Sequence, residues 1–429
     1  MKKVAFETFG CKVNQYETAC IAADFIRSGY SIVDFSEDAD VYIINTCTVT
    51  NRTDYKSRNA IRKVLKRKAS NPDIKLVVTG CYAQLNLQQI NKMGDIDFII
   101  DNNQKGEVIK CLKDEKVSFQ DIFNYDSFDE IQTDFMLGKS RAFLKIQDGC
   151  NFYCSYCTIP LARGKPRSRK PEKIIEQVNR LVASGYEEIV LGGINLGLYG
   201  VDLKGKWRLA EILNLIEKET DIKMIRLSSI EPQLFSDKLL KYFSDSKKIC
   251  PHFHIPLQSG SDFILEKMKR RYRTADFTRT VKAIKNIFPY SALGFDVIVG
   301  FPGEDERRFN ETYSYLFETA FTYLHVFSYS RRKNTPAFKM KGHVNGKIIK
   351  RRNRKLTSLS KQKKDFHIKM LLQNKIKLSG VNEKEVDGYF TALSDHFTRI
   401  YIAQNPKIKN GLIQGYPEAR FCDGLLVRD

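Results

Sequence analysis

The stretch RAFLKIQDGCNFYCSYC, residues 141–157, joins an apolar strand pattern to three closely spaced cysteines. Cys150, Cys154 and Cys157 follow a C-x3-C-x2-C spacing. Thiolates are soft ligands that suit zinc or iron–sulfur clusters. Structural zinc usually takes four protein ligands, whereas three cysteines on a [4Fe–4S] cluster leave one iron without a protein ligand. On spacing alone, a cluster with an open iron competes with a zinc site completed by a distant Cys or His.

Alternating strand and helix patterns continue from this stretch. Strand-like runs lie at residues 141–149, 187–197, 224–232, 252–260, 292–304 and 323–332. Helical patterns separate most of them, for example at residues 171–185 and 305–320. Residues 139–344 therefore predict six β/α units, which are typical of an open partial barrel related to the TIM barrel.

The first 110 residues predict a separate α/β layered domain. Strand patterns lie at residues 2–10, 40–46, 74–80 and 96–101, and helical patterns at 16–29 and 56–70. Residues 111–138 are mixed and polar with little periodicity, so we interpret them as a linker.

Three further cysteines each follow a strand pattern of this first domain: Cys11, Cys47 and Cys81. The carboxyl ends of strands in open α/β sheets lie on one side, where ligands bind. The spacing therefore favours a convergent ligand set. The alternative is three buried core cysteines, because free Cys is often buried. The remaining cysteines show no such pattern and are interpreted as spare or buried: Cys20, Cys111, Cys250 and Cys422.

Polar and glycine residues end several strand patterns of the predicted barrel, where βα loops usually build the active site. These candidate cofactor-binding residues are Gly192, Gly193, Glu231, Gln258 and Asp296. The two glycines would allow the backbone to approach a small ligand closely.

The chain is strongly basic, with 71 Lys and Arg against 50 Asp and Glu and a formal net charge of +21. Such an excess favours a polyanionic partner, although a solvated Lys-rich surface is the alternative. Residues 345–371 predict a basic linker helix, and residues 372–429 show short β-rich runs typical of a small β-barrel. The arginines predicted to contact RNA phosphates are Arg163, Arg167, Arg169, Arg351, Arg352 and Arg354.

The 10 cysteines are not arranged as a secreted disulfide framework, and no apolar run of 18 residues occurs. We therefore expect a reducing, cytoplasmic compartment and no membrane partner.

Several motifs together resemble the radical S-adenosylmethionine methylthiotransferases, over nearly the whole chain. They are FGCKVNQYET, NTCTVT, TGCYAQ, DGCNFYCSYCTIPLARGKPRSR, SSIEP, HIPLQSGSD and DVIVGFPGE. The resemblance implies that Cys150, Cys154 and Cys157 hold the [4Fe–4S] cluster whose open iron binds S-adenosylmethionine, with Tyr156 near its adenine. It implies that Cys11, Cys47 and Cys81 hold an auxiliary [4Fe–4S] cluster.

The resemblance also implies a TRAM-like RNA-binding domain at residues 372–429 and a tRNA anticodon stem-loop as partner. It implies an electron donor of the flavodoxin or ferredoxin type, while the sulfur source stays unknown. The branch that the motifs resemble most converts N6-threonylcarbamoyladenosine to its 2-methylthio derivative. Branches that act on isopentenyladenosine or on a ribosomal protein are the alternatives, and an RNA-binding module with structural zinc is the non-enzymatic one. Arg331 and Arg332 are candidate cations for the threonylcarbamoyl carboxylate.

Overall fold

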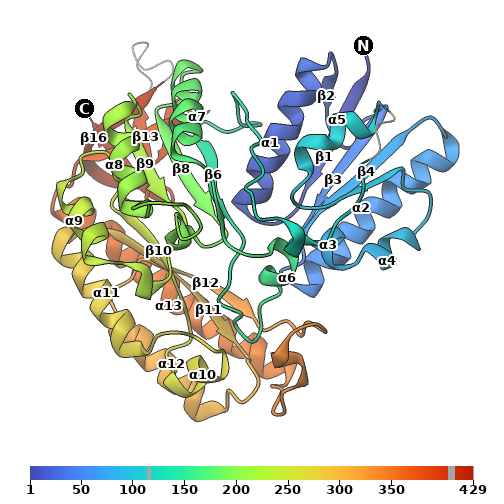
Figure 1. The fold of residues 1–429 in the computed structure, drawn as a ribbon. Coiled ribbons are helices and arrows are strands. Elements are labelled where there is room, and N and C mark those ends of the chain that lie inside the picture. Colours follow the sequence, from blue (N-terminus) through green and yellow to red (C-terminus); the bar gives the residue numbers. More distant parts are fainter. Residues whose placement is uncertain (114–116, 404–410, 429) are drawn as a thin grey trace.

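The structure is a computed structural model that describes residues 1–113, 117–403 and 411–428 (Figure 1). The chain begins with a five-stranded parallel sheet of order β2-β1-β3-β4-β5. Its strands are β1 (Lys3–Thr8), β2 (Ser31–Val33), β3 (Val41–Thr46), β4 (Lys75–Gly80) and β5 (Phe98–Ile100). Its helices are α1 (Lys12–Arg27), α2 (Asn51–Ser70), α3 (Cys81–Leu85), α4 (Leu87–Asn91) and α5 (Val108–Cys111).

This sheet forms because its central strands are continuous apolar runs that can be buried on both faces. All residues of β3, with the sequence VYIINT, are buried. Helix α2 begins at a capping box in which Thr50 and Thr53 satisfy each other's backbone N–H groups. Strand β2 was not predicted, because three residues are too few to show a period.

The central unit holds six parallel strands in two groups, β6-β8-β9 and β10-β11-β12. A parallel bridge between Ile225 and Ile249 joins the groups. The strands are β6 (Ala142–Asp148), β8 (Glu188–Gly193), β9 (Met224–Leu227), β10 (His252–Gln258), β11 (Ala292–Val299) and β12 (Tyr323–Ser328), with β7 (Arg167–Ser168) antiparallel to β6. The intervening helices are α6 (Ile159–Arg163), α7 (Pro171–Ala183), α8 (Leu209–Glu219), α9 (Asp237–Asp245), α10 (Asp262–Lys267), α11 (Thr274–Ile287) and α12 (Glu306–Glu318).

The open β/α architecture predicted from the sequence is confirmed, and each predicted strand of the central unit is present. Within the predicted linker, residues 117–138 carry little regular structure but pack against both neighbouring units. Ile131 and Met136 are buried in the main hydrophobic core, and the Tyr16 hydroxyl donates to the carbonyl of Ile131 at 2.9 Å. This segment therefore packs helix α1 of the first unit against the central one.

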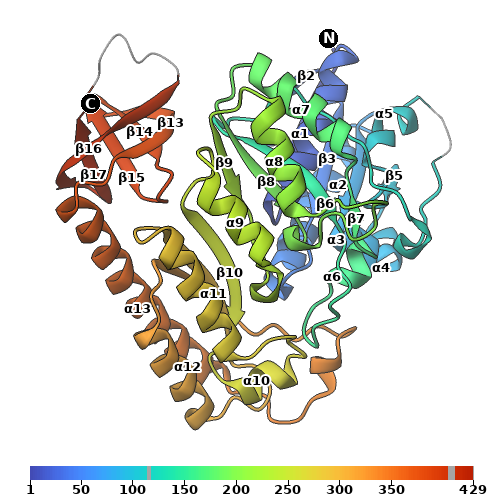
Figure 2. The same cartoon turned by 60° about the vertical axis from the view of Figure 1, so that its left-hand side comes forward.

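The C-terminal part is one helix followed by a closed β-barrel (Figure 2). The helix is α13 (Gly346–Gln373), and the barrel strands are β13 (Leu378–Val386), β14 (Tyr389–Leu393), β15 (Arg399–Ala403), β16 (Leu412–Phe421) and β17 (Gly424–Arg428). The barrel docks on the central unit near the start of β10. The Phe397 ring stacks on His252 with centroids 4.1 Å apart, and Arg226 donates to the carbonyl of Ser394 at 3.0 Å.

Among the helices of the described ranges, none has the length and apolarity that a membrane span requires.

Candidate functional site

The C-x3-C-x2-C stretch forms the loop that leaves strand β6. The backbone N–H of Cys150 donates to the carbonyl of Gly164, and that of Cys157 to the carbonyl of Cys154, both at 3.0 Å. Burial raises the pKa of the Cys157 thiol to about 12, and the neighbouring Cys154 adds to the shift. A buried thiol of this kind stays protonated until a metal displaces the proton, as ligation requires.

A cavity of about 320 Å³ lies against this loop. All three loop cysteines line it, together with residues from the carboxyl ends of the central strands. Val49 and Thr50, which follow Cys47 in the first unit, also line it. The cavity therefore lies where the two units meet.

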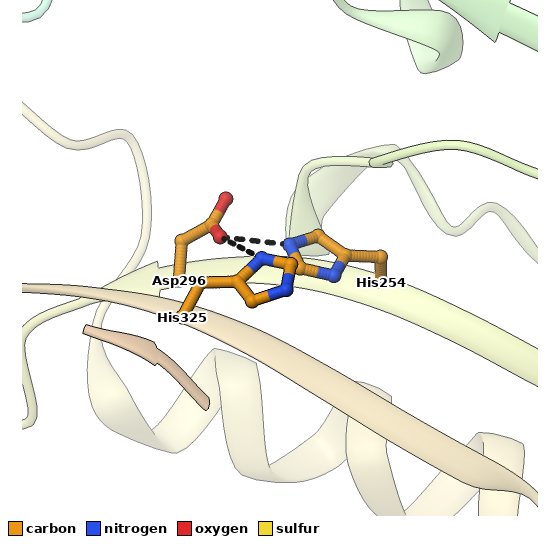
Figure 3. A group of neighbouring side chains, drawn as sticks. All are labelled: His254, Asp296 and His325. Atoms are coloured by element: carbon orange, nitrogen blue, oxygen red, sulfur yellow. Dashed lines mark hydrogen bonds and ion pairs between the residues drawn. The ribbon is translucent and has the colours of Figure 1, made fainter. Parts of the chain in front are cut away.

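Four of the predicted cofactor-binding residues line this cavity: Tyr156, Glu231, Gln258 and Asp296. Asp296 accepts from His254 Nε2 at 2.9 Å and His325 Nδ1 at 3.3 Å through the same oxygen, Oδ1 (Figure 3). The contact of these four residues with S-adenosylmethionine stays a prediction.

Gly192 and Gly193 do not line the cavity, and their predicted contact with a cofactor stays a prediction. A Cβ on Gly193 would lie 2.8 Å from Gln147 Oε1. Gln147 in turn donates to the carbonyl of Gly149 at 2.7 Å and accepts from the N–H of Asn195 at 2.8 Å. The close approach at Gly193 therefore serves a side chain that holds the cysteine loop.

Arg270 lines the cavity and was missed by sequence reasoning. Its guanidinium donates to Cys154 Sγ at 3.2 Å and forms an ion pair with Glu231. The Arg270 guanidinium carbon also lies over the Tyr272 ring, 4.9 Å from its centroid, and this contact further restricts the side chain. Nothing in the sequence distinguishes Arg270 from the other basic residues between α10 and α11.

Asn195 was also missed. Its Nδ2 donates to Cys150 Sγ at 3.9 Å, while its buried Oδ1 has no hydrogen-bond partner among the described residues. An unpaired buried acceptor costs stability. The cavity thus brings together three thiols, an unpaired acceptor and the Glu231–Arg270 ion pair. These groups fit a cluster and a polar cofactor.

The second cysteine set lies at the carboxyl ends of β1, β3 and β4. Cys11 precedes α1, Cys47 follows β3, and Cys81 begins α3. Gly10 and Gly80, directly before two of them, both have φ of +100°. A Cβ on Gly10 would lie 2.7 Å from Cys47 Sγ, so the glycine permits the close approach of the two cysteine loops.

The electrostatics show that these thiols are neighbours. Burial raises the pKa of Cys47 to about 12, and Cys81 and Cys11 raise it further. Asn102 Nδ2 donates to Cys81 Sγ at 3.8 Å, and Arg163 Nε donates to the same sulfur at 3.3 Å.

Arg163 was predicted to contact RNA, and the structure contradicts this. Its side chain is fully buried. It donates to Glu17 Oε1 at 2.5 Å, to Asn14 Oδ1 at 2.6 Å and to Asp148 Oδ2 at 3.1 Å. Burial alone raises the pKa of Glu17, but its neighbouring cations hold that pKa well below its ordinary value.

Arg167 and Arg169 are buried as well, so their predicted RNA contacts are corrected. Arg167 donates to the carbonyl of Arg163 at 3.0 Å. Arg169 donates to Glu130 at 3.0 Å and to the Tyr16 hydroxyl at 3.0 Å. The sequence of this basic loop resembles that of an exposed loop, because the hydrogen-bond acceptors of its arginines lie far away along the chain.

The buried charges around Arg163 favour an anionic ligand at the second cysteine set. The network holds the cations Arg163, Lys105 and Lys145 and the carboxyl groups of Glu17, Asp148 and Asp129. Arg163 also donates to Cys81 Sγ, and its buried positive charge favours a negative partner there. Thiolates on an iron–sulfur cluster would supply that negative charge, so the residues present fit such a cluster.

Of the arginines predicted on α13, Arg352 is also buried, and its RNA contact is corrected. It donates to Glu304 Oε2 at 2.8 Å. Arg351 and Arg354 are exposed, although Arg351 lies 2.7 Å from Glu306. Their contact with RNA stays a prediction.

Two parts of the chain match known families. Residues 3–101 match the uncharacterized protein family UPF0004, and residues 144–316 match the radical SAM superfamily. The solved radical S-adenosylmethionine methyltransferase TsrM from Kitasatospora setae superposes with a TM-score of 0.60 at 12% identity. The match covers 79% of this chain and 77% of that chain. The fold is thus that of radical S-adenosylmethionine enzymes.

Two relatives extend over most of the chain. The threonylcarbamoyladenosine tRNA methylthiotransferase MtaB of Bacillus subtilis is 38% identical over 100% of this chain and 97% of its own length. The protein of the same name from Aquifex aeolicus is 43% identical over 84% of this chain and 88% of its own. This chain therefore belongs to the radical S-adenosylmethionine methylthiotransferases. The non-enzymatic alternative, an RNA-binding module with structural zinc, is wrong.

Proposed function

We propose that this protein transfers a methylthio group to C2 of N6-threonylcarbamoyladenosine beside the anticodon of a tRNA. The observation that carries the proposal is the placement of two three-cysteine sets on either side of one segment, residues 157–163. That segment ends at Arg163, which touches Cys81, and begins at Cys157, which lines the cavity. The substrate follows from the relatives, whose names specify it.

In this proposal each cysteine set holds a cluster through three thiolates. Cys150, Cys154 and Cys157 would hold the cluster at the cavity, and Cys11, Cys47 and Cys81 the auxiliary one. The clusters and S-adenosylmethionine, when bound, supply the radical chemistry that an unactivated adenine carbon requires.

The residues of the chain orient the reactants. Arg270 fixes Cys154 by donating to its sulfur, and Glu231 and Gln258 offer polar atoms at the cavity wall. Val49 and Phe327 line the cavity with 50% and 41% of their surface exposed. Exposed apolar side chains at a cavity mouth suit packing against an unstacked base of an RNA loop.

Nucleoside mass spectrometry tests the proposal. A host that lacks this activity receives the wild-type gene or a gene with Cys150, Cys154 and Cys157 replaced by Ala. We expect 2-methylthio-N6-threonylcarbamoyladenosine in tRNA with the wild-type gene alone. A product on isopentenyladenosine only, or on a ribosomal protein, would move the chain to another branch. The electron donor of the flavodoxin or ferredoxin type stays a prediction.

A further inference from the structure

The threonylcarbamoyl group needs polar partners, and the following inference rests on the proposed function. This group carries a carboxylate, a hydroxyl and a ureido linkage with N–H donors, whereas an isopentenyl group is apolar. A buried carboxylate without partners is costly. A selective enzyme should therefore place donors and an acceptor beside the adenine, close to the cavity.

Of the two arginines predicted for this role, Arg332 lies elsewhere and is corrected, whereas the role of Arg331 stays a prediction. Arg332 is buried, and it donates to Asp54 Oδ2 and to Asn51 Oδ1, both at 2.8 Å. Arg331 lies over the Phe338 ring, 5.1 Å from its centroid, and does not line the cavity. Arg332 joins the two units instead of facing a ligand.

Three polar side chains from neighbouring strands meet at Asp296, which lines the cavity. Figure 3 shows His254 of β10, Asp296 of β11 and His325 of β12 turned toward one another. Their ligand atoms lie within 4.8 Å of one another. Asp296 Oδ1 accepts from both rings, and no described residue donates to Oδ2.

A second layer of contacts holds this group in place. The Tyr323 hydroxyl lies 3.1 Å from His254 Nδ1 and 2.9 Å from His252 Nε2. Tyr323 crosses β11 at Gly294, where a Cβ would lie 2.1 Å from the Tyr323 ring. This glycine is required for the crossing, and the crossing fixes the ring of His254.

The group presents complementary atoms on its open side. Its side chains are 10% exposed for His254, 20% for Asp296 and 52% for His325. A carboxylate only accepts, so the ring nitrogens that face Asp296 carry hydrogens. His325 can then offer its other nitrogen, Nε2, outward. Held between the Asp296 carboxylate and a substrate carboxylate, this ring has one nitrogen facing each of them.

We infer that His254, Asp296 and His325 form the recognition site for the threonylcarbamoyl group. Asp296 Oδ2 accepts an N–H of the ureido linkage, and His325 Nε2–H donates to the carboxylate. His254 positions Asp296, and Tyr323 positions His254. Because Asp296 also lines the cavity of the three loop cysteines, the substituent lies next to the reacting base.

Binding of two tRNA forms tests this site. The affinity of each variant is compared for the same tRNA bearing N6-threonylcarbamoyladenosine or unmodified adenosine. His325→Phe should weaken binding of the modified form about 10- to 100-fold, as expected for a hydrogen bond to a charged group. Binding of the unmodified form and cleavage of S-adenosylmethionine without tRNA should not change. His325→Gln, which keeps a hydrogen-bond donor, should lose less affinity for the modified tRNA.

His343→Phe is the matched control. His343 does not line the cavity, although its ring stacks on Tyr329, which does, and this variant should keep the preference for the modified tRNA. Undiminished preference for the modified tRNA in His325→Phe overturns the inference. So does tight Zn²⁺ binding that His325→Phe abolishes, because the group would then be a metal site. If the wild-type protein forms no product on the modified tRNA, the proposed function fails instead.

A different observation assigns a surface to the RNA backbone. Helix α2 starts at the cavity, since Thr50 lines it. Its basic residues Arg52, Lys56, Lys63 and Lys66 are exposed at spacings that place them on one face. The only acid of the helix, Asp54, is paired with Arg332. Within the described ranges, these four cations make no ion pair.

We propose that this face of α2 binds the phosphates of the tRNA stem. Like charges at helical spacing destabilise a helix, and a polyanion would relieve that cost. From Arg52 to Lys66 the face extends about 21 Å away from the cavity, at 1.5 Å per residue. An anticodon base in the cavity would thus leave its stem beside α2.

The salt dependence of tRNA binding tests the surface. Replacing Arg52, Lys56 and Lys63 together with Gln should reduce the slope of log affinity against log salt by about 2 to 3. A second variant tests the competing prediction for α13: it replaces Arg351, Arg354 and Lys361, which are also exposed and carry the same charge. A slope that falls only in the α13 variant overturns the proposal for α2 and supports α13 as the contact.

Discussion

Replacing Arg163 with Met separates a structural role from an RNA contact. The substitution keeps an unbranched apolar stem and removes the guanidinium. Glu17 and Asp148 each keep a lysine partner, because Lys145 lies 3.0 Å from Glu17 and 3.1 Å from Asp148. The expected cost is therefore at the lower end for a broken buried ion pair, about 3 kcal/mol of the free energy of unfolding.

The same substitution removes the positive charge that donates to Cys81 Sγ. We expect the auxiliary cluster to be retained less well, so that iron per chain falls toward half while S-adenosylmethionine cleavage persists. Binding of tRNA should keep its salt slope, because a buried guanidinium contacts no phosphate.

Three measurements on one preparation decide the outcome: denaturant unfolding, iron and sulfide per chain, and tRNA affinity against salt. Lys165→Gln is the control, since Lys165 lies in the same loop with 59% of its side chain exposed. If Arg163→Met keeps wild-type stability and iron but lowers the salt slope by about one contact, the buried network is refuted and Arg163 is an RNA ligand.

Three further outcomes are expected. Replacing Cys150, Cys154 and Cys157 with Ala should leave about half the iron and abolish S-adenosylmethionine cleavage; full iron would contradict two separate sites. Burial raises the pKa of Asp129 to about 7 from 3.8, so its contribution to the stability of the cluster-free protein is complete below pH 4 and is lost as pH rises through 7. In denaturant unfolding, Asp129→Asn should reduce this pH-dependent loss of the free energy of unfolding by about 2–4 kcal/mol. A pH profile identical to that of the wild type would contradict this prediction. Arg332→Met should cost about 3 kcal/mol and increase proteolysis between the units, because it leaves the Asp54 carboxylate without its cation, whereas Arg331→Met should do neither.

The sequence predicted what depends on local pattern. Cys11, Cys47 and Cys81 were found because each follows an apolar run, and the order of a parallel sheet then brings such positions to one edge. The six strands of the central unit were found for the same reason. Strand β7, with two residues, shows no pattern and was not predicted.

The errors came from long-range pairing. Arg163 is buried because Glu17, 146 residues earlier, accepts from it, and nothing near either residue in the sequence reports the other. Arg352 is buried by Glu304 in the same way. His325 and Asp296 escaped notice as a pair because the register of β11 and β12 alone aligns them. Side-chain partners across strands and units are fixed by packing, which periodicity does not encode.

The stacking of Phe397 on His252 has a consequence for truncated forms of the protein. The Phe397 ring also lies 4.7 Å from Tyr323, so the C-terminal barrel closes the end of the strands opposite the cavity. Removing the barrel would open this end and let water reach the Tyr323 hydroxyl and the histidines that it holds. Water that reaches the active site of a radical enzyme can react with its intermediates. Chains without the barrel should therefore hold His254 and Asp296 less rigidly, because the Tyr323 hydroxyl contacts His254 and His254 contacts Asp296.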